Sequence, residues 1–544
     1  MHTEITRREY RFVLLVGAVA LFVTSIPYIL GAALATDGRI FGGFVYAVED
    51  CYSYLAKMRE GAGGAWLFHI AYTPEPHSGA FFFPFHLLLG KIAALLPGGD
   101  LTTRMVLVYH GARLLFGLGL LLTVYRFLAE FTPRLAVRRL AWLMVTFDGG
   151  LGWLLVALGQ PNWLGSLPLD FILPEGFTFL VLYGFPHIAL ARALLLWGLL
   201  FLLWAWEANP QSRTTHHAPR NTHHAIRNTQ YATLSGLCWL LMGLIVPFYV
   251  GVAWAVAGAA WLALALRGRR IPWREGLLAA LAALLSAPVV AYSAWVFTSD
   301  PVYKTWATQN LVLSPHPLHY LAAYGVPLLL AAFALRPAWR SARPVWLPLA
   351  WVAVVPLLVY LPFNLQRRLV EGVQVPLSLL AAWGLVKISK SRLLVSVILV
   401  SLSLTNVLLV AGNSLALRGR PAPIYRDAGQ VAAMDWLNGR VRPDDVVLTS
   451  YATGNYLPAR VGARVFVGHG PESVHAAEKD ELVRQFFSAA TDDTWRRWLL
   501  EEYGVDYVFW GPEERATGTF DPGEAGFLSP VYTAKAHIIY EVVP

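Results

Sequence analysis

The chain has 544 residues, of which 56% are hydrophobic and 14% charged, and its mean hydropathy is +0.50. So large an apolar fraction exceeds what one soluble core can bury, which excludes a soluble enzyme and predicts a multi-pass protein of the cell (inner or plasma) membrane. The net charge of +9 does not indicate a nucleic-acid partner, because Lys and Arg fall mostly in short loops between apolar runs, where they report membrane topology.

The first apolar run, 12–34, is long enough to span a bilayer. It lacks a small-residue cleavage site after a short apolar stretch, so we expect a retained helix rather than a removed signal peptide. Six basic clusters flank the apolar runs, and the positive-inside rule places all of them in the cytoplasm. They lie at 7–11, 134–139, 213–227, 267–270, 336–343 and 387–392.

The chain must cross the membrane an even number of times between any two cytoplasmic clusters, and this requirement decides how two segments are interpreted. As one helix, 233–266 would be roughly 51 Å long against a hydrocarbon core of about 30 Å, so it is predicted to form two spans that turn near Pro247. The segment 81–97 is predicted to be an interfacial or re-entrant helix. The fold class is therefore mainly α, a transmembrane bundle of about eleven spans with the amino terminus inside and the carboxyl terminus outside.

The first outer loop carries two adjacent carboxylates, Glu49 and Asp50, together with Tyr72 and Glu75 as supporting substrate-binding candidates. A carboxylate can deprotonate a sugar or phenolic hydroxyl when the leaving group is an ionised phosphate, and positioned proton transfer contributes about 10²- to 10⁴-fold. Asp50 is the predicted base, and Glu49 would bind a cation or orient the acceptor. Alternatively, the pair caps a helix that begins near Cys51, since acids are favoured at a helix amino terminus. The two interpretations are compatible.

The second outer loop adds Asp170, Glu175 and His187. A divalent cation, Mg²⁺ or Mn²⁺, held by Asp50, Asp170 or Glu175 could bridge to a phosphate, although spacing alone is weak support for such a site. His187 opens a span and is a candidate phosphate ligand, but a helix-capping or structural histidine is an equally good interpretation.

Arg367 and Arg368 are an exception to the charge rule, because parity places them on the outer side of the membrane. Guanidinium groups match phosphate oxygens, so the pair is predicted to hold a lipid phosphate headgroup. The alternative is that both side chains reach ordinary headgroups or cap the next helix. Lys304, in the third outer loop, is a further phosphate-binding candidate, although a solvated lysine is the simpler interpretation.

After residue 412 the composition becomes that of a soluble domain, so 1–412 is predicted to be the membrane domain and 413–544 a small extracytoplasmic α/β domain. The segment 468–472 (Gly-His-Gly-Pro-Glu) is interpreted as a tight turn, since it lacks the spacing of a nucleotide-binding loop. Helices are predicted at 427–437, 475–489 and 494–503, and strands at 446–448, 464–467, 507–510 and 537–542.

This layout resembles the GT-C superfamily of polytopic membrane glycosyltransferases. The resemblance implies a polyprenyl-phosphate-linked sugar as donor, an acceptor that is a glycan, lipid or protein, and a first-loop acid acting as base or metal ligand, which falls on Asp50 and less surely on Glu49. Where family members have an acidic pair in the second outer loop, this chain has separated Asp170 and Glu175, which leaves metal dependence open. The residues that carry the resemblance are Glu49-Asp50, 72–75, 81–97 and Arg367-Arg368.

Two other classes of function are compatible with the composition. A transporter or lipid flippase would show charged groups along several spans and two pseudo-symmetric halves, and neither is visible in the sequence. A non-catalytic lipid- or glycan-binding subunit of an envelope assembly would keep the fold but turn Glu49 and Asp50 away from the lipid cavity.

Overall fold

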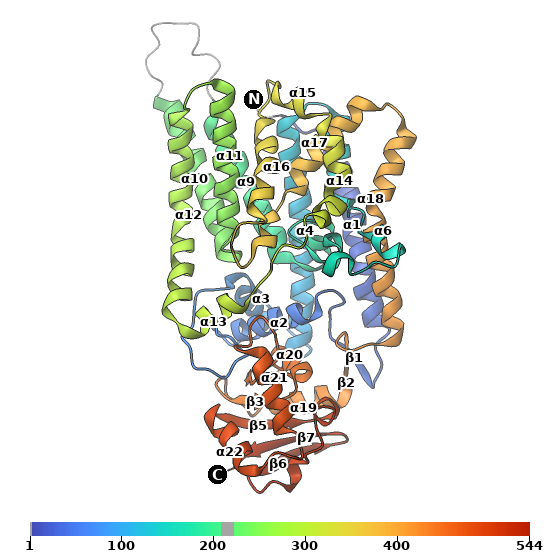
Figure 1. Ribbon diagram of the computed structural model, residues 1–544, viewed down its shortest axis with the longest axis vertical. Helices are drawn as coiled ribbons and strands as arrows, with labels where there is room; N and C mark the ends of the chain where they lie inside the picture. Colours follow the sequence, from blue (N-terminus) through green and yellow to red (C-terminus); the bar gives the residue numbers. More distant parts are fainter. Residues whose placement is uncertain (1–2, 208–221, 544) are drawn as a thin grey trace. The chain divides into compact units, whose positions relative to one another are not determined.

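The computed structural model describes residues 3–207 and 222–543, with the side chains of 222–225 left out; much of the third basic cluster therefore lies outside the described residues. The chain is mainly helical with a small mixed sheet near its carboxyl end, as predicted (Figure 1). Among the described residues, six helices have the length and apolar composition to cross a membrane. They are α1 (Arg7–Ala33), α4 (Leu101–Phe131), α9 (Pro186–Trp206), α11 (Tyr249–Gly268), α12 (Trp273–Ser299) and α18 (Arg392–Ala416).

The other predicted spans correspond to α10 and to shorter apolar helices. The break near Pro247 is confirmed, because α10 (Thr222–Ile245) ends just before it and α11 begins just after it. Pro327 and Pro356 lie inside two of the short helices, where each removes a backbone hydrogen bond. The short helices are α5 (Leu135–Phe147), α14 (Leu318–Ala332), α16 (Trp346–Leu358) and α17 (Gln374–Ile388).

By contacts the chain forms two compact units, each assembled from separate segments. Unit 1 contains Met1–Ser25, Ala112–Ala294 and Val312–Ala411, and unit 2 contains Ile26–Gly111, Trp295–Leu311 and Gly412–Pro544. The segment after residue 412 therefore shares a unit with the first predicted outer loop.

Unit 1 is a helical bundle with charged groups in its interior. Helix α9 packs on α10, α14 on α17, α17 on α5 and α11 on α16. The Arg192 guanidinium is fully buried, and its Nε lies 2.5 Å from the Glu371 carboxylate, so neither charge is left unpaired. The remaining short elements are α6 (Gly152–Ala157), η1 (Trp163–Gly165), α7 (Leu169–Ile172), α8 (Thr178–Gly184), α15 (Leu335–Trp339) and η3 (Gln366–Val370).

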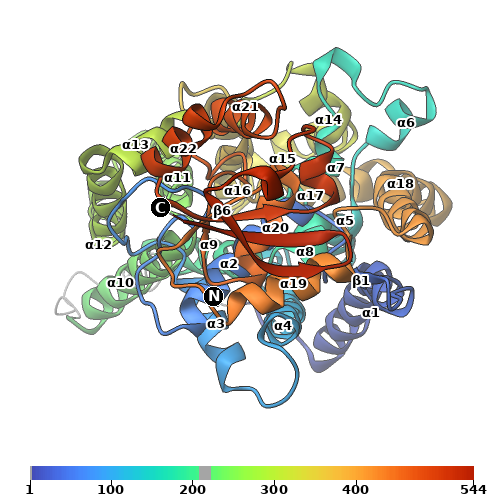
Figure 2. The same ribbon diagram turned by 90° about the horizontal axis from the view of Figure 1, so that it is seen from below.

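Unit 2 contains a five-stranded sheet in the order β4-β3-β5-β7-β6, in which β4, β3 and β5 are parallel and β7 and β6 are antiparallel to their neighbours (Figure 1). Helices α21 and α22 cover one face, and α19 lies against β7 and β6 on the other (Figure 2). A second, two-stranded sheet pairs β1 with β2, joining residues on either side of the long helical segment. The bounds are β1 (Arg39–Phe41), β2 (Tyr425–Asp427), β3 (Val446–Leu448), β4 (Arg464–Val465), β5 (Val505–Trp510), β6 (Leu528–Ala534), β7 (His537–Val542), α19 (Ala428–Asn438), α20 (Tyr451–Arg460), α21 (Ala476–Phe486), α22 (Asp493–Glu502), α23 (Pro512–Arg515), α13 (Pro301–Gln309), η4 (Leu417–Gly419) and η5 (Pro522–Glu524).

Two glycines allow α2 (Val48–Ala62) and α3 (Pro84–Leu95) to touch backbone to backbone. A methyl group at Gly90 would lie 1.8 Å from the Met58 carbonyl oxygen, and one at Gly61 would lie 2.1 Å from the Leu87 carbonyl oxygen. With only 12 residues, α3 is too short to span a bilayer unaided, which agrees with the predicted interfacial or re-entrant helix. The position of α3 therefore depends on this crossing.

Gly90→Ala should lower the free energy of unfolding by about 1–3 kcal/mol, because the added methyl group must push the two backbones apart. The matched control is Gly111→Ala in α4, where nothing lies within 4 Å of the added carbon and the lower backbone entropy of alanine makes the change neutral or stabilising. Thermal unfolding in detergent measures both. Equal stability of the two variants would contradict the close crossing.

Candidate functional site

Glu49 and Asp50 lie in the first turn of α2, so the prediction that they sit in a loop was wrong. Ala47 precedes the helix with φ 46° and ψ 48°, a left-handed conformation, and no side chain caps the helix. The unpaired N–H groups of the first turn favour negative charge, as the alternative interpretation of the pair proposed. Glu49 is exposed and Asp50 is half-buried, so both carboxylates stay accessible.

One face of α2 carries a chain of polar groups that starts at Asp50. The spacings of three and four residues place Asp50, Ser53 and Lys57 on the same side of the helix. The Nε2 of His469 lies 3.2 Å from Asp50 Oδ1, and its Nδ1 lies 3.6 Å from Glu472 Oε1. The imidazole therefore stands between a half-exposed carboxylate and a buried one.

This series of polar groups on α2 ends in a buried ion pair between Lys57 and Glu472. Lys57 Nζ lies 2.7 Å from Glu472 Oε1, and the two side chains are only 1% and 7% exposed. Ser53 Oγ donates to the same oxygen at 2.7 Å, and the ammonium group lies 4.4 Å from the centre of the Phe83 ring. Burial raises the pKa of Glu472, but the charges of Lys57 and His469 outweigh it and hold that pKa below its usual value. Glu472 is thus a fixed anion at neutral pH.

The turn 468–473 presents His469 and Glu472 to α2. Ser473 Oγ accepts from the backbone N–H groups of Gly468 at 3.0 Å and His469 at 3.2 Å. Gly468 passes so close to Gly454 that an added methyl group would lie 2.4 Å from its carbonyl group. The predicted tight turn at 468–472 is therefore present, but it also supplies two side chains of the site.

Tyr451, at the start of α20, connects this turn to Glu49. Its hydroxyl donates to Glu49 Oε2 at 3.3 Å and accepts from the Gly470 N–H at 3.0 Å. Burial, followed by the charge of Glu49, raises the pKa of Tyr451 to about 12. Tyr451 is therefore a neutral hydrogen-bond donor to Glu49.

Tyr72 and Glu75 also belong to unit 2, where they pack around the same cluster. The Tyr72 ring lies 5.5 Å from the His469 ring, and its hydroxyl donates to the Asn455 carbonyl at 3.1 Å. Glu75 pairs with the buried Lys479 of α21 at 2.6 Å. These partners hold both side chains in place within unit 2.

His77 braces the segment between residues 69 and 77. Its Nδ1 donates to the Glu75 carbonyl at 2.8 Å and its Nε2 accepts from the Ile70 N–H at 2.8 Å, an arrangement that only the neutral ring can make. Burial lowers the pKa of His77, in agreement with this geometry.

The other predicted site residues are distributed over both units. In unit 1, Arg368 Nε lies 3.6 Å from the buried Glu175, and the neighbouring Arg367 is half-buried within η3. His187 is buried in the first turn of α9, and Lys304 is exposed on α13 of unit 2.

The described residues show no assembled site for the predicted divalent metal. Asp170 Oδ2 accepts from the Gly152 N–H at 2.8 Å and from Thr405 Oγ1 at 2.7 Å, whereas its Oδ1 makes no hydrogen bond among the described residues, and Glu175 lies beside a guanidinium group. Asp50 faces His469. Over residues 3–207 and 222–543, no group of three or more His, Cys, Asp or Glu side chains is placed to hold an ion.

Sequence reasoning missed His469, Glu472, Lys57 and Ser53. The last two could have been found, because their spacing from Asp50 matches one helical face once the loop is recognised as a helix. Their partners could not, since Lys57 and Glu472 are separated by 415 positions and nothing periodic connects them.

Comparison with solved structures shows that the chain has the GT-C fold. ArnT from Cupriavidus metallidurans bound to undecaprenyl phosphate matches with a TM-score of 0.53 and 12% identity, over 97% of this chain and 98% of that one. The oligosaccharyltransferase of Archaeoglobus fulgidus in its apo form matches with a TM-score of 0.50 and 13% identity, over 93% and 70% of the two chains. Both are GT-C membrane glycosyltransferases. Neither a protein-family model nor a curated protein matches the chain.

Lys57→Met should lower the free energy of unfolding by about 3–5 kcal/mol, because it leaves the Glu472 carboxylate buried without its cation. Adding Glu472→Met to this variant should recover most of the loss, since both charges are then gone. Asp444→Asn, which breaks the pair of the 86% exposed Asp444 with Arg464, is the control and should change little. Denaturant unfolding of the detergent-solubilised protein measures all three. A single Lys57→Met variant as stable as the control would contradict the buried pair.

Acid should loosen the segment 69–77. Because the folded pKa of His77 is lowered, its contribution to stability is complete above the unfolded pKa of about 6.5 and is lost as the pH falls through the folded pKa. Hydrogen exchange at the Ile70 amide, corrected for the intrinsic rate, should accelerate in the wild type as the pH falls below the unfolded pKa of about 6.5. In His77→Gln, which cannot titrate, the corrected rate should stay level. Parallel behaviour of the two proteins would rule out the neutral ring as the brace.

Proposed function

We propose that the chain is an integral membrane glycosyltransferase that moves a sugar from a polyprenyl-phosphate donor to an acceptor hydroxyl on the outer face of the membrane. The observation that carries the proposal is the placement of Asp50, a half-exposed carboxylate held by His469, which is itself backed by the buried Lys57–Glu472 pair. The fold shared with ArnT, whose structure is bound to undecaprenyl phosphate, supports a lipid-phosphate donor.

In the proposed reaction the acceptor oxygen forms a bond to the anomeric carbon of the donor sugar. Asp50 takes the proton from the acceptor hydroxyl as that bond forms. The bond between the anomeric carbon and the phosphate oxygen breaks, and the electron pair leaves with the polyprenyl phosphate. No oxidant, reductant or nucleotide is needed.

His469 and Glu49 would prepare Asp50 for this step. The hydrogen bond from the imidazole to Oδ1 fixes the rotamer of the carboxylate that would receive the proton. Glu49, which accepts from Tyr451, would orient the acceptor by a further hydrogen bond. Both roles require partners from the turn 468–473 and α20, so the carboxyl-terminal segment would be part of the catalytic apparatus.

Arg367 and Arg368 are proposed to bind the leaving phosphate. In the described part of the chain the buried Nε of Arg367 makes no hydrogen bond, so this guanidinium group keeps donor capacity for a phosphate oxygen. Glu175 lies beside Arg368 and would hold its side chain in place. The roles of Tyr72, Glu75, His187 and Lys304 in binding substrate, and the domain boundary at residue 412, stay predictions.

Asp50→Asn should reduce turnover by about 10²- to 10⁴-fold with little change in donor affinity, since the amide keeps the shape but cannot take the proton. The measurement is release of polyprenyl phosphate from polyprenyl-phosphate sugars by the protein reconstituted in vesicles. The matched control is Asp37→Asn, the same change at an exposed position before α2, which should keep wild-type turnover. Wild-type turnover in Asp50→Asn would remove Asp50 from the mechanism.

A further inference from the structure

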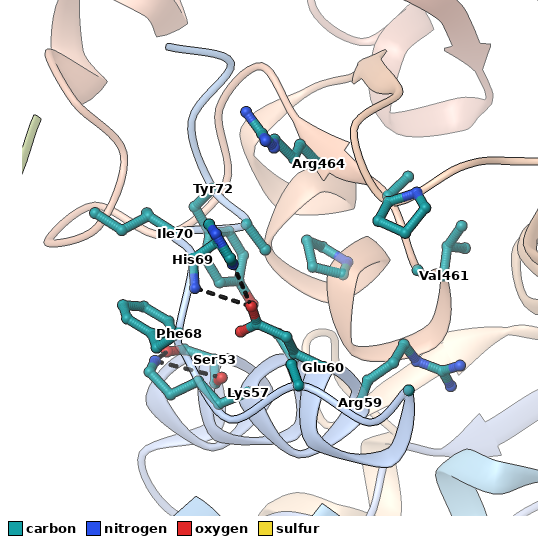
Figure 3. Close-up of a pocket in the computed structure, with 18 of the residues that line it drawn as sticks. Ser53, Lys57, Arg59, Glu60, Phe68, His69, Ile70, Tyr72, Val461 and Arg464 are labelled. Carbon is teal, nitrogen blue, oxygen red and sulfur yellow. Dashed lines mark hydrogen bonds and ion pairs between the residues drawn. The ribbon is translucent and has the colours of Figure 1, made fainter. Parts of the chain in front are cut away.

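A cavity of about 580 Å³ lies against α2 within unit 2, and Ser53 and Lys57 are among the residues that line it (Figure 3). Its walls come from α2, the segment after it and the segment 443–464, with the turn that carries Glu472 closing one side. Ser53 lines the cavity and lies one helical turn, about 4.5 Å along the axis, from Asp50. The volume is within the range of small-molecule sites.

The cations in the lining are already engaged by the protein. Lys57 is paired with Glu472, the Arg59 guanidinium donates to the Ala459 carbonyl and to Thr102, and Arg464 is paired with Asp444. The lining also contains three carboxylates, those of Glu60, Asp444 and Glu472. Their formal charges cancel those of the three cations. The cavity therefore offers no surplus positive charge for a phosphate or carboxylate.

The acceptors in the lining, in contrast, are not all used. Glu472 Oε2 is buried and makes no hydrogen bond among the described residues, although its carboxylate lines the cavity. The Glu60 carboxylate reaches from α2 to His69, whose N–H and Nδ1 both contact the same oxygen, Oε1, at 2.9 and 2.7 Å (Figure 3). Glu60 Oε2 takes no part in that pair. A ligand that donates hydrogen bonds without carrying charge would satisfy Glu60 Oε2.

Most of the remaining lining is apolar and built from small side chains. Phe68 and Ile70 on one side and Val461 on the other give apolar walls (Figure 3), and the lining also contains several small alanines and prolines. A sugar suits a cavity of this kind. Its hydroxyl groups can donate hydrogen bonds to carboxylates, while its C–H faces pack on apolar side chains. This combination of walls and acceptors identifies the class of ligand.

We propose that this cavity binds a neutral, polyhydroxylated sugar unit of the acceptor. This proposal deepens the proposed function, and the identification of the sugar as an acceptor rests on that function. A sugar held against Ser53 would present a hydroxyl toward Asp50. The substrate class is then a glycan or glycoconjugate rather than a peptide or a simple lipid.

The test is sugar binding without a donor, measured by saturation-transfer NMR on the full chain in lipid nanodiscs. The protein carries Asp50→Asn, so that binding is read independently of transfer. The neutral probes are glucose, galactose, mannose and N-acetylglucosamine, and the charged probes are glucosamine and glucuronate. At least one neutral sugar should bind with Kd below about 10 mM, and both charged probes should bind less tightly than their neutral counterparts.

Two cavity variants and a matched control make the result specific. Ala62→Phe fills the cavity from the half-exposed end of α2 and should abolish binding, and Glu60→Gln should weaken it about tenfold. Ala94→Phe, the same enlargement at an exposed position of α3 outside the lining, should bind like the parent.

Three outcomes would overturn the inference: no neutral sugar binds, glucosamine or glucuronate binds more tightly, or Ala62→Phe binds like Ala94→Phe. Its failure is distinguishable from failure of the enzyme proposal. If sugar binding depends on the cavity but the wild type releases no polyprenyl phosphate, the glycan site stands and the transferase assignment falls. If phosphate is released but no sugar occupies the cavity, the transferase assignment stands and the acceptor class is wrong.

Discussion

The buried ion pair between Lys57 and Glu472 is the interaction on which the rest of the candidate site depends. Removing two charges from water costs several kcal/mol per ion, and an interior pair persists only when its remaining hydrogen-bonding capacity is met. Here Ser53 and His469 surround the carboxylate, and the Phe83 ring lies beside the ammonium group. The pair fixes the turn 468–473 against α2, and through that turn it fixes the imidazole that contacts Asp50.

This arrangement explains why a protein with a large apolar bundle also carries a small mixed sheet. Strand β3 leads into α20, and β4 leads into the turn 468–473, so the parallel edge of the sheet delivers Tyr451 and His469 to the start of α2. Ligands bind at such carboxyl ends of parallel strands in many α/β proteins, because the loops there are held by a rigid scaffold. The sheet thus supports the two acids in the first turn of α2.

Much of the architecture could be predicted from the sequence because it depends on local patterns. The strands at 446–448 and 537–542 match β3 and β7 residue for residue, and the break at Pro247 follows from helix length alone. Strand β6 was missed because Pro530 argues against a strand, but β6 is an edge strand, where a missing N–H is tolerated. Helix α20 was missed because it contains Gly454 and Pro458, both poor helix formers.

The chemistry of the site was only half predictable. The paired acids stand out because charged residues are rare in this chain, and their position at a helix start agrees with one of the two interpretations. Their partners lie some four hundred positions away, so no spacing rule reveals them. The same holds for Glu75, whose partner Lys479 lies on α21.

The central claim is that the imidazole of His469 positions the Asp50 carboxylate for proton transfer. The most direct measurement is the turnover of His469→Gln with a polyprenyl-phosphate sugar. His475→Gln, a matched change at an exposed histidine six residues later, is the reference. The account predicts that His469→Gln loses at least about tenfold in kcat while the donor KM stays within twofold, because the base is misplaced but donor contacts remain. Turnover of His469→Gln equal to that of His475→Gln would contradict it.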